Sequence, residues 1–216
     1  RFIANGYRSK FYTIKVAAKP VVQHFEISCD YPAYTGKTDE TIKNMGDLVV
    51  PVGTKITWRF SAANTEQLTI DFGDSATSVK QTGEQQFVHN KTMMQSSMYK
   101  VTAYGSESKF SDSSVYSINV VPDLYPVIAV NEKRDSVSDK YFYYIGEVSD
   151  DYGLHNLTFN YQLIRADSTT GTTKQMNVSL QAGNASPFTF YWSLKDFGIK
   201  PGDKLNYYFE VWDNDG

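Results

Sequence analysis

The sequence has only one cysteine and no long apolar run. The single Cys29 cannot form an internal disulfide, which excludes a disulfide-stapled fold and leaves the cellular compartment open. No segment approaches the roughly 20 apolar residues that a membrane-spanning helix requires, and no signal peptide stands at Arg1. We therefore expect this segment to come from a longer protein and to make no membrane contact of its own.

Charge of one sign is not in excess either. The chain carries 21 Lys and Arg against 24 Asp and Glu, a formal net charge of −3, and both signs are scattered along it. A surface that binds nucleic acid or anionic lipid needs a basic cluster, which this pattern lacks. The sequence therefore predicts no nucleic-acid partner.

Motifs of catalysis are also missing. There is no Gly-x-Ser-x-Gly nucleophile motif and no glycine-rich phosphate loop. His24, His89 and His155 lie in separate stretches without a second ligand at metal spacing, and Cys29 has no paired histidine motif. We predict that the chain is not an enzyme and holds no cofactor, apart from the calcium considered below.

What the sequence does contain favours β-structure. Aromatic residues make up 15% of the chain, with 16 Tyr, and Val, Ile and Thr recur in short runs, as is typical of pleated sheets. Alternation is clearest where polar residues separate Ile56, Trp58 and Phe60, which predicts a half-buried strand and places Trp58 in a core. The predicted class is all-β, with short strands arranged as sandwiches.

The stretch from Tyr116 to Pro126 marks a domain boundary. An alternating strand over residues 116–121 runs into Pro122 and Pro126, which cannot continue a sheet ladder. A chain of 216 residues suits two domains of about 100 residues each. We therefore predict a hairpin left from a preceding domain (residues 1–18), one β-sandwich (19–122) and a second β-sandwich (123–216).

Both ends of this array are expected to be incomplete. In the hairpin, Phe2–Asn5 is predicted to pair with Phe11–Val16 around the intervening turn. The polar stretch 31–44 of the first sandwich has too few apolar residues for a core strand. In the second sandwich, Leu205–Val211 is the last strand, where a tandem array requires one more. We predict that this strand borders an open sheet edge or is paired by another copy.

Six segments in collinear order resemble one bacterial family. They read ANGYRS (4–9), DYPAYTG (30–36), GDLVVPVGT (46–54), YSINVVPD (116–123), SDDYGL (149–154), and PGDKL followed by FEVWDND (201–215). Together they resemble the membrane-anchored envelope proteins of the domain of unknown function 4175 type. The resemblance implies an N-terminal anchor, tandem immunoglobulin-like domains and a periplasmic or cell-surface location, and it brings no catalytic residues.

Acidic side chains gather in two loops of the predicted second sandwich. Asp150 and Asp151 follow its second strand, and Asp213 and Asp215 follow its sixth, two loops that share one tip in an immunoglobulin-like domain. Carboxylate oxygens are the ligands that Ca²⁺ prefers, so this tip is a candidate calcium site, with Asp123 of the linker nearby. On the alternative interpretation, these residues simply make turns through local backbone bonds.

Outward aromatic residues form the second candidate site. If the strand 205–211 turns its odd-numbered residues to the core, Tyr208 and Trp212 face outward, and so must one of Tyr143 and Tyr144. Such rings would stack on a sugar or anchor a partner protein, or they would cover the seam with a neighbouring domain. A contiguous exposed aromatic patch away from the domain junction would favour binding.

These features predict a non-catalytic structural and interaction module of a membrane-anchored bacterial envelope protein. Its partners would be the neighbouring domains of the same chain and, beyond them, an envelope protein or a glycan. The alternative is a glycan- or peptide-binding β-sandwich that uses exposed aromatic residues or an open strand edge.

Overall fold

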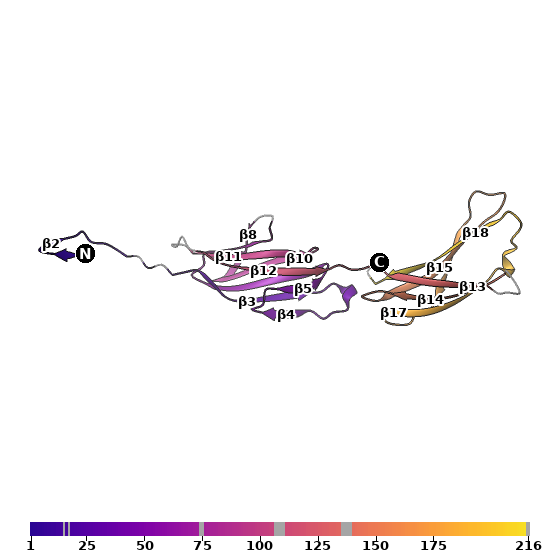
Figure 1. Ribbon diagram of the computed structural model, residues 1–216, viewed down its shortest axis with the longest axis horizontal. Helices are drawn as coiled ribbons and strands as arrows, with labels where there is room; N and C mark the ends of the chain where they lie inside the picture. Colours follow the sequence, from indigo (N-terminus) through magenta and orange to yellow (C-terminus); the bar gives the residue numbers. More distant parts are fainter. Residues whose placement is uncertain (15, 17, 74–75, 106–110, 135–139, 215–216) are drawn as a thin grey trace. The chain divides into compact units, whose positions relative to one another are not determined.

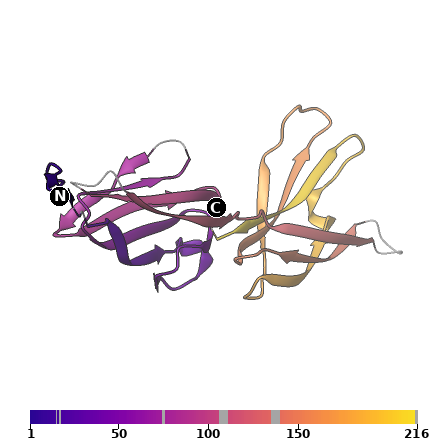
Figure 2. The same cartoon turned by 60° about the vertical axis from the view of Figure 1, so that its left-hand side comes forward.

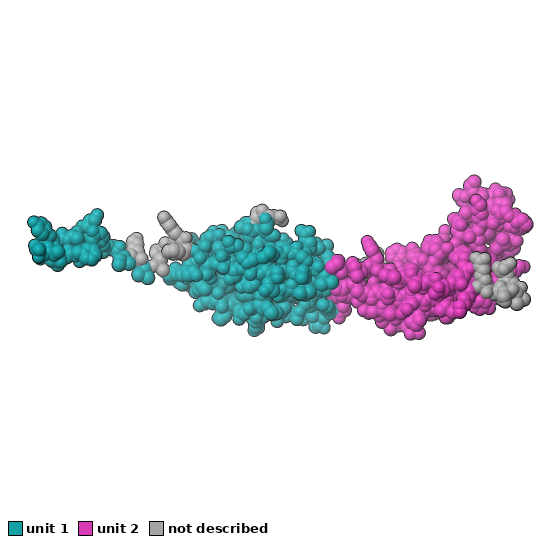
Figure 3. All heavy atoms as spheres, viewed as in Figure 1, with its two compact units in different colours: residues 1–32, 37–121 teal, residues 33–36, 122–216 magenta. Residues whose placement is uncertain are grey.

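The computed structural model divides the chain into two compact units, each with its own hydrophobic core (Figures 1 and 3). Unit 1 comprises residues 1–32 and 37–121, and unit 2 comprises residues 33–36 and 122–216. The structure describes residues 1–14, 16, 18–73, 76–105, 111–134 and 140–214. Among them, no helix is long and apolar enough to span a membrane.

Unit 1 is a sandwich of two five-stranded sheets, β4-β3-β6-β10-β9 and β5-β12-β11-β7-β8. Within them, β3-β6-β10-β9 and β12-β11-β7 reproduce the ABED and GFC strand orders of the immunoglobulin-like fold. The strands are β3 (Val21–Asp30), β4 (Glu40–Lys43), β5 (Leu48–Pro51), β6 (Thr54–Ala63), β7 (Gln67–Asp71), β8 (Ala76–Ser78), β9 (Lys80–Gly83), β10 (Gln86–Met93), β11 (Ser97–Tyr104) and β12 (Ser111–Val121).

Alternation along β6 explains how this strand builds the core of unit 1. Ile56, Trp58 and Phe60 are buried on one face, while Arg59 is exposed on the other. β6 lies between β3 and β10, so its backbone is hydrogen-bonded on both sides. Trp58 is 0% exposed, which confirms the predicted core tryptophan.

The polar stretch between β3 and β5 forms an edge. It contains a short 3-10 helix, η1 (Ala33–Thr35), and β4, which pairs with β3 alone among the described strands. No residue of β4 is buried, so it is not a core strand, as predicted, although Ile42 and Tyr31 of this stretch pack, partly buried, against the core. The sequence did not predict β4 as a strand, because backbone pairing at a sheet edge needs no apolar side chains.

Unit 2 is a smaller sandwich of two three-stranded sheets, β13-β14-β17 and β16-β15-β18 (Figure 2). These orders correspond to strands ABE and C′CF of an immunoglobulin-like domain, so the predicted fold class is confirmed. The elements are β13 (Val127–Arg134), β14 (Tyr141–Ser149), β15 (Leu154–Ile164), β16 (Thr173–Val178), β17 (Ala185–Ser193), the 3-10 helix η2 (Lys195–Phe197) and β18 (Lys204–Asp213).

Aromatic rings fill the core of unit 2. Phe159 is fully buried, and its ring centroid lies 4.7 Å from those of Phe190 and Trp192 and 5.0 Å from that of Phe209. Ring pairs at such distances add stabilisation beyond the area they bury. The core of this small unit therefore depends on a few large side chains in mutual contact.

The strand β18 lies at a sheet edge. In the described part of the chain it pairs with β15 alone. Its residues Leu205, Tyr207, Phe209 and Val211 pack against the core of unit 2. The open edge that the sequence predicted for Leu205–Val211 is therefore confirmed for the described residues.

The N-terminal hairpin is tighter than predicted. β1 (Ile3–Ala4) pairs with β2 (Tyr7–Arg8) across Asn5-Gly6, and both turn residues have positive φ. Asn-Gly favours a two-residue type I′ turn, which sets this register locally. The predicted second strand, Phe11–Val16, is wrong, since the described residues of that stretch form no strand.

Candidate functional site

The outer face of the sheet β13-β14-β17 carries three neighbouring tyrosines. β14 and β17 turn their even-numbered aromatic residues into the core, so Tyr141, Tyr143 and Tyr191 face outward. Tyr143 pairs with Tyr191 in the strand register, with ring centroids 5.0 Å apart, and the Tyr141 ring lies 5.9 Å from that of Tyr191. Tyr143 is 45% exposed and Tyr191 is 49% exposed. We call these three residues the tyrosine face.

Two lysines flank the tyrosine face. The Nζ of Lys195 in η2 lies 4.9 Å from the centroid of the Tyr141 ring, which is a cation–π contact. A hydrogen bond with the Tyr141 side chain raises the pKa of Lys195, so its ammonium group stays charged at neutral pH. Lys133 is exposed and pairs with Tyr143 in the register of β13 and β14. The rings therefore lie between two positive charges.

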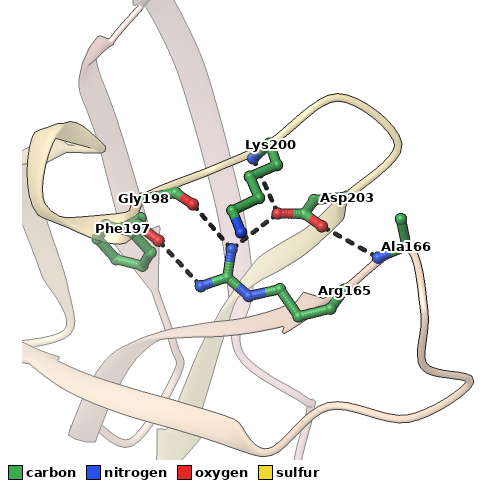
Figure 4. Close-up of polar contacts among 6 residues, drawn as sticks. All are labelled: Arg165, Ala166, Phe197, Gly198, Lys200 and Asp203. Atoms are coloured by element: carbon green, nitrogen blue, oxygen red, sulfur yellow. Dashed lines mark hydrogen bonds and ion pairs between the residues drawn. The ribbon is translucent and has the colours of Figure 1, made fainter.

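An ionic clamp holds the loop that follows η2 (Figure 4). The Nη1 of Arg165 donates hydrogen bonds to Asp203 Oδ2 at 2.7 Å and to the carbonyl oxygen of Gly198 at 2.9 Å, and its Nη2 donates to the carbonyl oxygen of Phe197 at 3.2 Å. One guanidinium group thus ties the residue after β15 to the end of η2. The clamp thereby helps to place Lys195, two residues before Phe197, beside the tyrosine face.

The carboxylate of this clamp is fully engaged. The Asp203 side chain is 3% exposed and accepts backbone N–H bonds from Lys200 at 2.9 Å and from Ala166 at 3.0 Å. The bond from Lys200 and the bond from Arg165 hold the pKa of Asp203 below its ordinary value. The Asp203 carboxylate stays ionised near neutral pH, and its role is structural, because it accepts the hydrogen bonds that hold this loop.

The tyrosine face lies at one end of its sheet. Val127 begins β13 and pairs with Ser149, whereas Lys133 pairs with Tyr143. Six residues along an antiparallel strand correspond to roughly 20 Å. The tyrosine face is therefore remote, within unit 2, from the residue that follows the proline-bearing linker.

The two aromatic residues predicted from β18 are exposed, but they belong to the other sheet. Tyr208 is 53% exposed and pairs with Asn160, and Trp212 is 43% exposed and pairs with Asn156. Their predicted outward orientation is confirmed. Because the outer faces of the two sheets of a sandwich point in opposite directions, Tyr208 and Trp212 do not join the tyrosine face.

Sequence reasoning missed most of the tyrosine face. It required one of Tyr143 and Tyr144 to face outward, and the structure exposes Tyr143 and buries Tyr144. It did not single out Tyr141 or Tyr191. The signal was present, since alternation around inward-facing Trp192 already places Tyr191 outward. What alternation does not reveal is which outward residues of distant strands become neighbours.

The first acidic loop of unit 2 uses its carboxylate to shape a turn. Asp150 Oδ2 accepts hydrogen bonds from the backbone N–H groups of Tyr152 and Gly153, both at 2.9 Å. This is the local bonding expected of an aspartate in a turn. The side chain of Asn184 donates to the carbonyl oxygen of the exposed Asp151 at 2.6 Å. The turn interpretation therefore accounts for Oδ2 of Asp150, whereas Oδ1 is buried without a hydrogen-bond partner among the described residues.

The two acidic loops do meet. Leu154 pairs with Asp213, and Asn214 Nδ2 donates to the carbonyl oxygen of Tyr152 at 2.9 Å. Asp215 lies outside the described residues. Within the described ranges, no group of three or more His, Cys, Asp or Glu side chains is placed to hold a metal ion. Calcium binding by the four aspartates of this tip therefore stays a prediction.

Unit 1 has a polar hollow of about 260 Å³, lined by Ser28, Asp30, Asp39, Glu40, Thr41, Thr57 and Arg59. Its groups have hydrogen-bond partners: Arg59 Nη1 donates to Ser28 Oγ at 2.8 Å, and Glu40 accepts a hydrogen bond from the hydroxyl of Tyr31, which lies outside the lining. Burial raises the pKa of the neighbouring Cys29 to about 11, and the negative charges of Glu40 and Asp30 contribute to this rise. The Cys29 thiol is therefore protonated at neutral pH and is a poor nucleophile.

Comparison with known proteins yields a family and several distant structural likenesses. The family with the description "Domain of unknown function (DUF4175)" matches residues 9–186. No curated protein matches the chain.

Similar solved structures include a chicken TCR, 8% identical, covering 70% of this chain and 88% of that one, with a TM-score of 0.31. A chimeric titin Z1Z2-Z1Z2 tandem is 10% identical, and the match covers 76% of this chain and 92% of the titin chain, with a TM-score of 0.30. The FN1-FN3 domains of chicken CNTN1 are 14% identical, and the match covers 87% of this chain and 72% of the CNTN1 chain, with a TM-score of 0.23. Because these scores are low, the fold assignment rests on the strand orders given above.

Proposed function

Because this chain belongs to the DUF4175 family, we propose that it is a non-catalytic structural and interaction module of a large bacterial envelope protein. The module would lie outside the cytoplasmic membrane, in the periplasm or at the cell surface, as part of a membrane-anchored chain. Its partners would be the neighbouring domains of the same protein. The observation that supports this function most directly is the pair of separate β-sandwich cores along one short chain.

The connection between the two cores suits a spacer. β12 ends at Val121 and β13 begins at Val127, so only residues 122–126 link the two sandwiches. Pro122 and Pro126 restrict the backbone torsions of this link. Two folded units joined by a short link with restricted backbone torsions can act as a spacer. Such a spacer separates the segment that precedes it from the segment that follows it, and it contributes no chemistry.

The location is tested by protease access to the full-length protein in its bacterial host. Spheroplasts with an intact cytoplasmic membrane are treated with proteinase K, and fragments are detected with antibodies against residues 19–216. We expect cleavage of the full-length protein while a cytoplasmic marker stays intact. Complete protection of the protein under these conditions would refute the extracytoplasmic location.

The spacer role is tested by replacement. In the full-length protein, residues 19–216 are exchanged for two unrelated immunoglobulin-like domains of equal size. A spacer keeps its function, measured as growth and envelope integrity of the host, because only its size and fold matter. Loss of function at normal protein level would refute the spacer role and favour specific binding by this segment.

The tyrosine face favours a second candidate function, a glycan- or peptide-binding module. Its exposed rings are contiguous and lie away from Val127, where the linker enters the unit. Rings that cover a domain seam would instead gather near that entry. Substitution of Tyr143 and Tyr191 by Ala in the full-length protein separates the two candidates, because a binding module loses function and a spacer does not.

A further inference from the structure

We propose that the tyrosine face, together with Lys133 and Lys195, binds an anionic polysaccharide whose sugar rings carry carboxylates. This inference rests on the second candidate function and names its ligand. Two features of the described residues carry it: exposed rings held in mutual contact on the face of a sheet, and the ammonium groups of two neighbouring lysines.

The rings are suited to sugar faces. The C–H face of a pyranose is apolar and its edge is polar, and a partly exposed tyrosine offers both an apolar ring and a hydroxyl. The contacts of Tyr191 with Tyr143 and Tyr141 restrict the motion of all three rings before any ligand arrives. Pre-organised rings lose less side-chain entropy on binding, which favours association.

The position of the rings on the face of the sheet favours a glycan over a peptide. Extended peptides commonly bind by adding a strand to a free sheet edge. β14, which carries Tyr141 and Tyr143, is paired on both sides, whereas β13 and β17 are the edge strands of this sheet. The rings lie on the face of the sheet and not along its edges, so a ligand bound to them is contacted by side chains, as in stacking on sugar rings.

The charges around the rings favour an anionic ligand. The ammonium of Lys195 lies over Tyr141, and Lys133 stands opposite Tyr143 in the register. Two carboxylates are also near: Asp196 follows Lys195 in η2, and Glu147 lies further along β14, where it pairs with Ala129 toward the Val127 end. The ring end of the sheet therefore presents the lysines, and a ligand carboxylate placed there gains charge-assisted hydrogen bonds.

The test is affinity electrophoresis of the purified 216-residue chain in gels that contain polygalacturonic acid or its carboxyl-reduced, neutral counterpart. The double variant Tyr143→Ala/Tyr191→Ala is expected to weaken binding at least about tenfold, while Tyr143→Phe/Tyr191→Phe, which keeps the rings, retains most of it. The variant Lys133→Gln/Lys195→Gln is expected to weaken binding to the acidic polymer, and added salt does the same to the unmodified chain.

Tyr208→Ala is the matched control, because Tyr208 is exposed to a similar degree but lies on the other sheet. It is expected to bind as the unmodified chain does, and thermal melts confirm that each variant is folded. Unchanged binding by the double alanine variant, or loss of binding in Tyr208→Ala instead, would overturn the assigned surface.

Two further outcomes separate this inference from the functions on which it rests. Equally tight binding of the neutral polymer through the same tyrosines would overturn the anionic ligand class and leave a glycan-binding face. Absence of binding to both polymers would overturn the inference, while the domain-replacement experiment decides separately whether the chain is a spacer.

Discussion

The separation of the two cores predicts that each unit unfolds on its own. Phe159 is 0% exposed in unit 2, and Phe60 is 1% exposed in unit 1. Truncation of a buried phenylalanine to alanine costs about 3–5 kcal/mol of unfolding free energy, because the ring leaves a cavity among its neighbours. The two substitutions Phe159→Ala and Phe60→Ala therefore form a reciprocal pair, one in each core.

The size of the effect follows from the size of the units. For a domain of about 100 residues, 1 kcal/mol shifts the melting temperature by roughly 4–8 °C. Phe159→Ala is therefore expected to lower the transition of unit 2 by at least about 12 °C. The transition of unit 1 should move by less than about 4 °C, because substitutions at distant sites without shared partners couple weakly. Phe60→Ala should show the reverse pattern.

Differential scanning calorimetry of the three proteins is the measurement. The milder variant Phe159→Leu gives a smaller shift of the same transition and keeps the test informative where the alanine variant does not fold. Tyr208→Ala, at an exposed position, should move neither transition. A single transition that moves as a whole in both alanine variants, or equal shifts of both transitions in either variant, would show that the two cores unfold as one and would refute the reasoning.

Two further predictions concern unit 2. Gly146→Ala should destabilise it by about 1–3 kcal/mol in urea unfolding, because the new Cβ would lie 2.5 Å from the carbonyl oxygen of Ala129 and 2.6 Å from the Phe188 ring. Asp203→Asn should lower the urea midpoint at pH 7, and the difference from the unmodified chain should shrink below about pH 4. The reason is that folding lowers the pKa of Asp203. The ionised carboxylate therefore stabilises the folded state at pH values above the pKa of an unfolded aspartate, and this stabilisation is lost as the pH falls through the lower pKa of the folded state.

Each of these has its own control and contrary result. Gly83→Ala, whose added Cβ would lie at an ordinary 3.6 Å from the Cβ of Gln86, should unfold like the unmodified chain. Equal stability of Gly146→Ala and Gly83→Ala would contradict the close packing of β14. A midpoint difference for Asp203→Asn that is the same at pH 7 and at about pH 2.5 would contradict the role of the ionised carboxylate.

The strands were predictable because the signal for a strand is local. Inward and outward residues alternate along each chain segment, so Ile56, Trp58 and Phe60 identify one face of β6 without knowledge of any neighbour. The same logic gave the outward orientation of Tyr208 and Trp212. It failed at Phe11–Val16, because the Asn-Gly turn closes the hairpin earlier than alternation alone indicates.

The candidate site was only partly predictable. Tyr143 and Tyr191 are 48 positions apart in the chain and become neighbours only through the pairing of β14 with β17. The clamp between Arg165 and Asp203 likewise joins residues 38 positions apart, and no motif in the sequence announces it. Contacts of this kind depend on strand register, in which a shift of one residue would turn every side chain to the opposite face.

The sequence by itself determined that the chain is all-β, that prolines interrupt it after residue 121, and which side of each strand is apolar, because these properties are carried by residues within a few positions of one another. Only the tertiary structure decided which outward side chains meet, because strand order and register bring together positions that no local pattern connects. The tyrosine face exists for that reason alone.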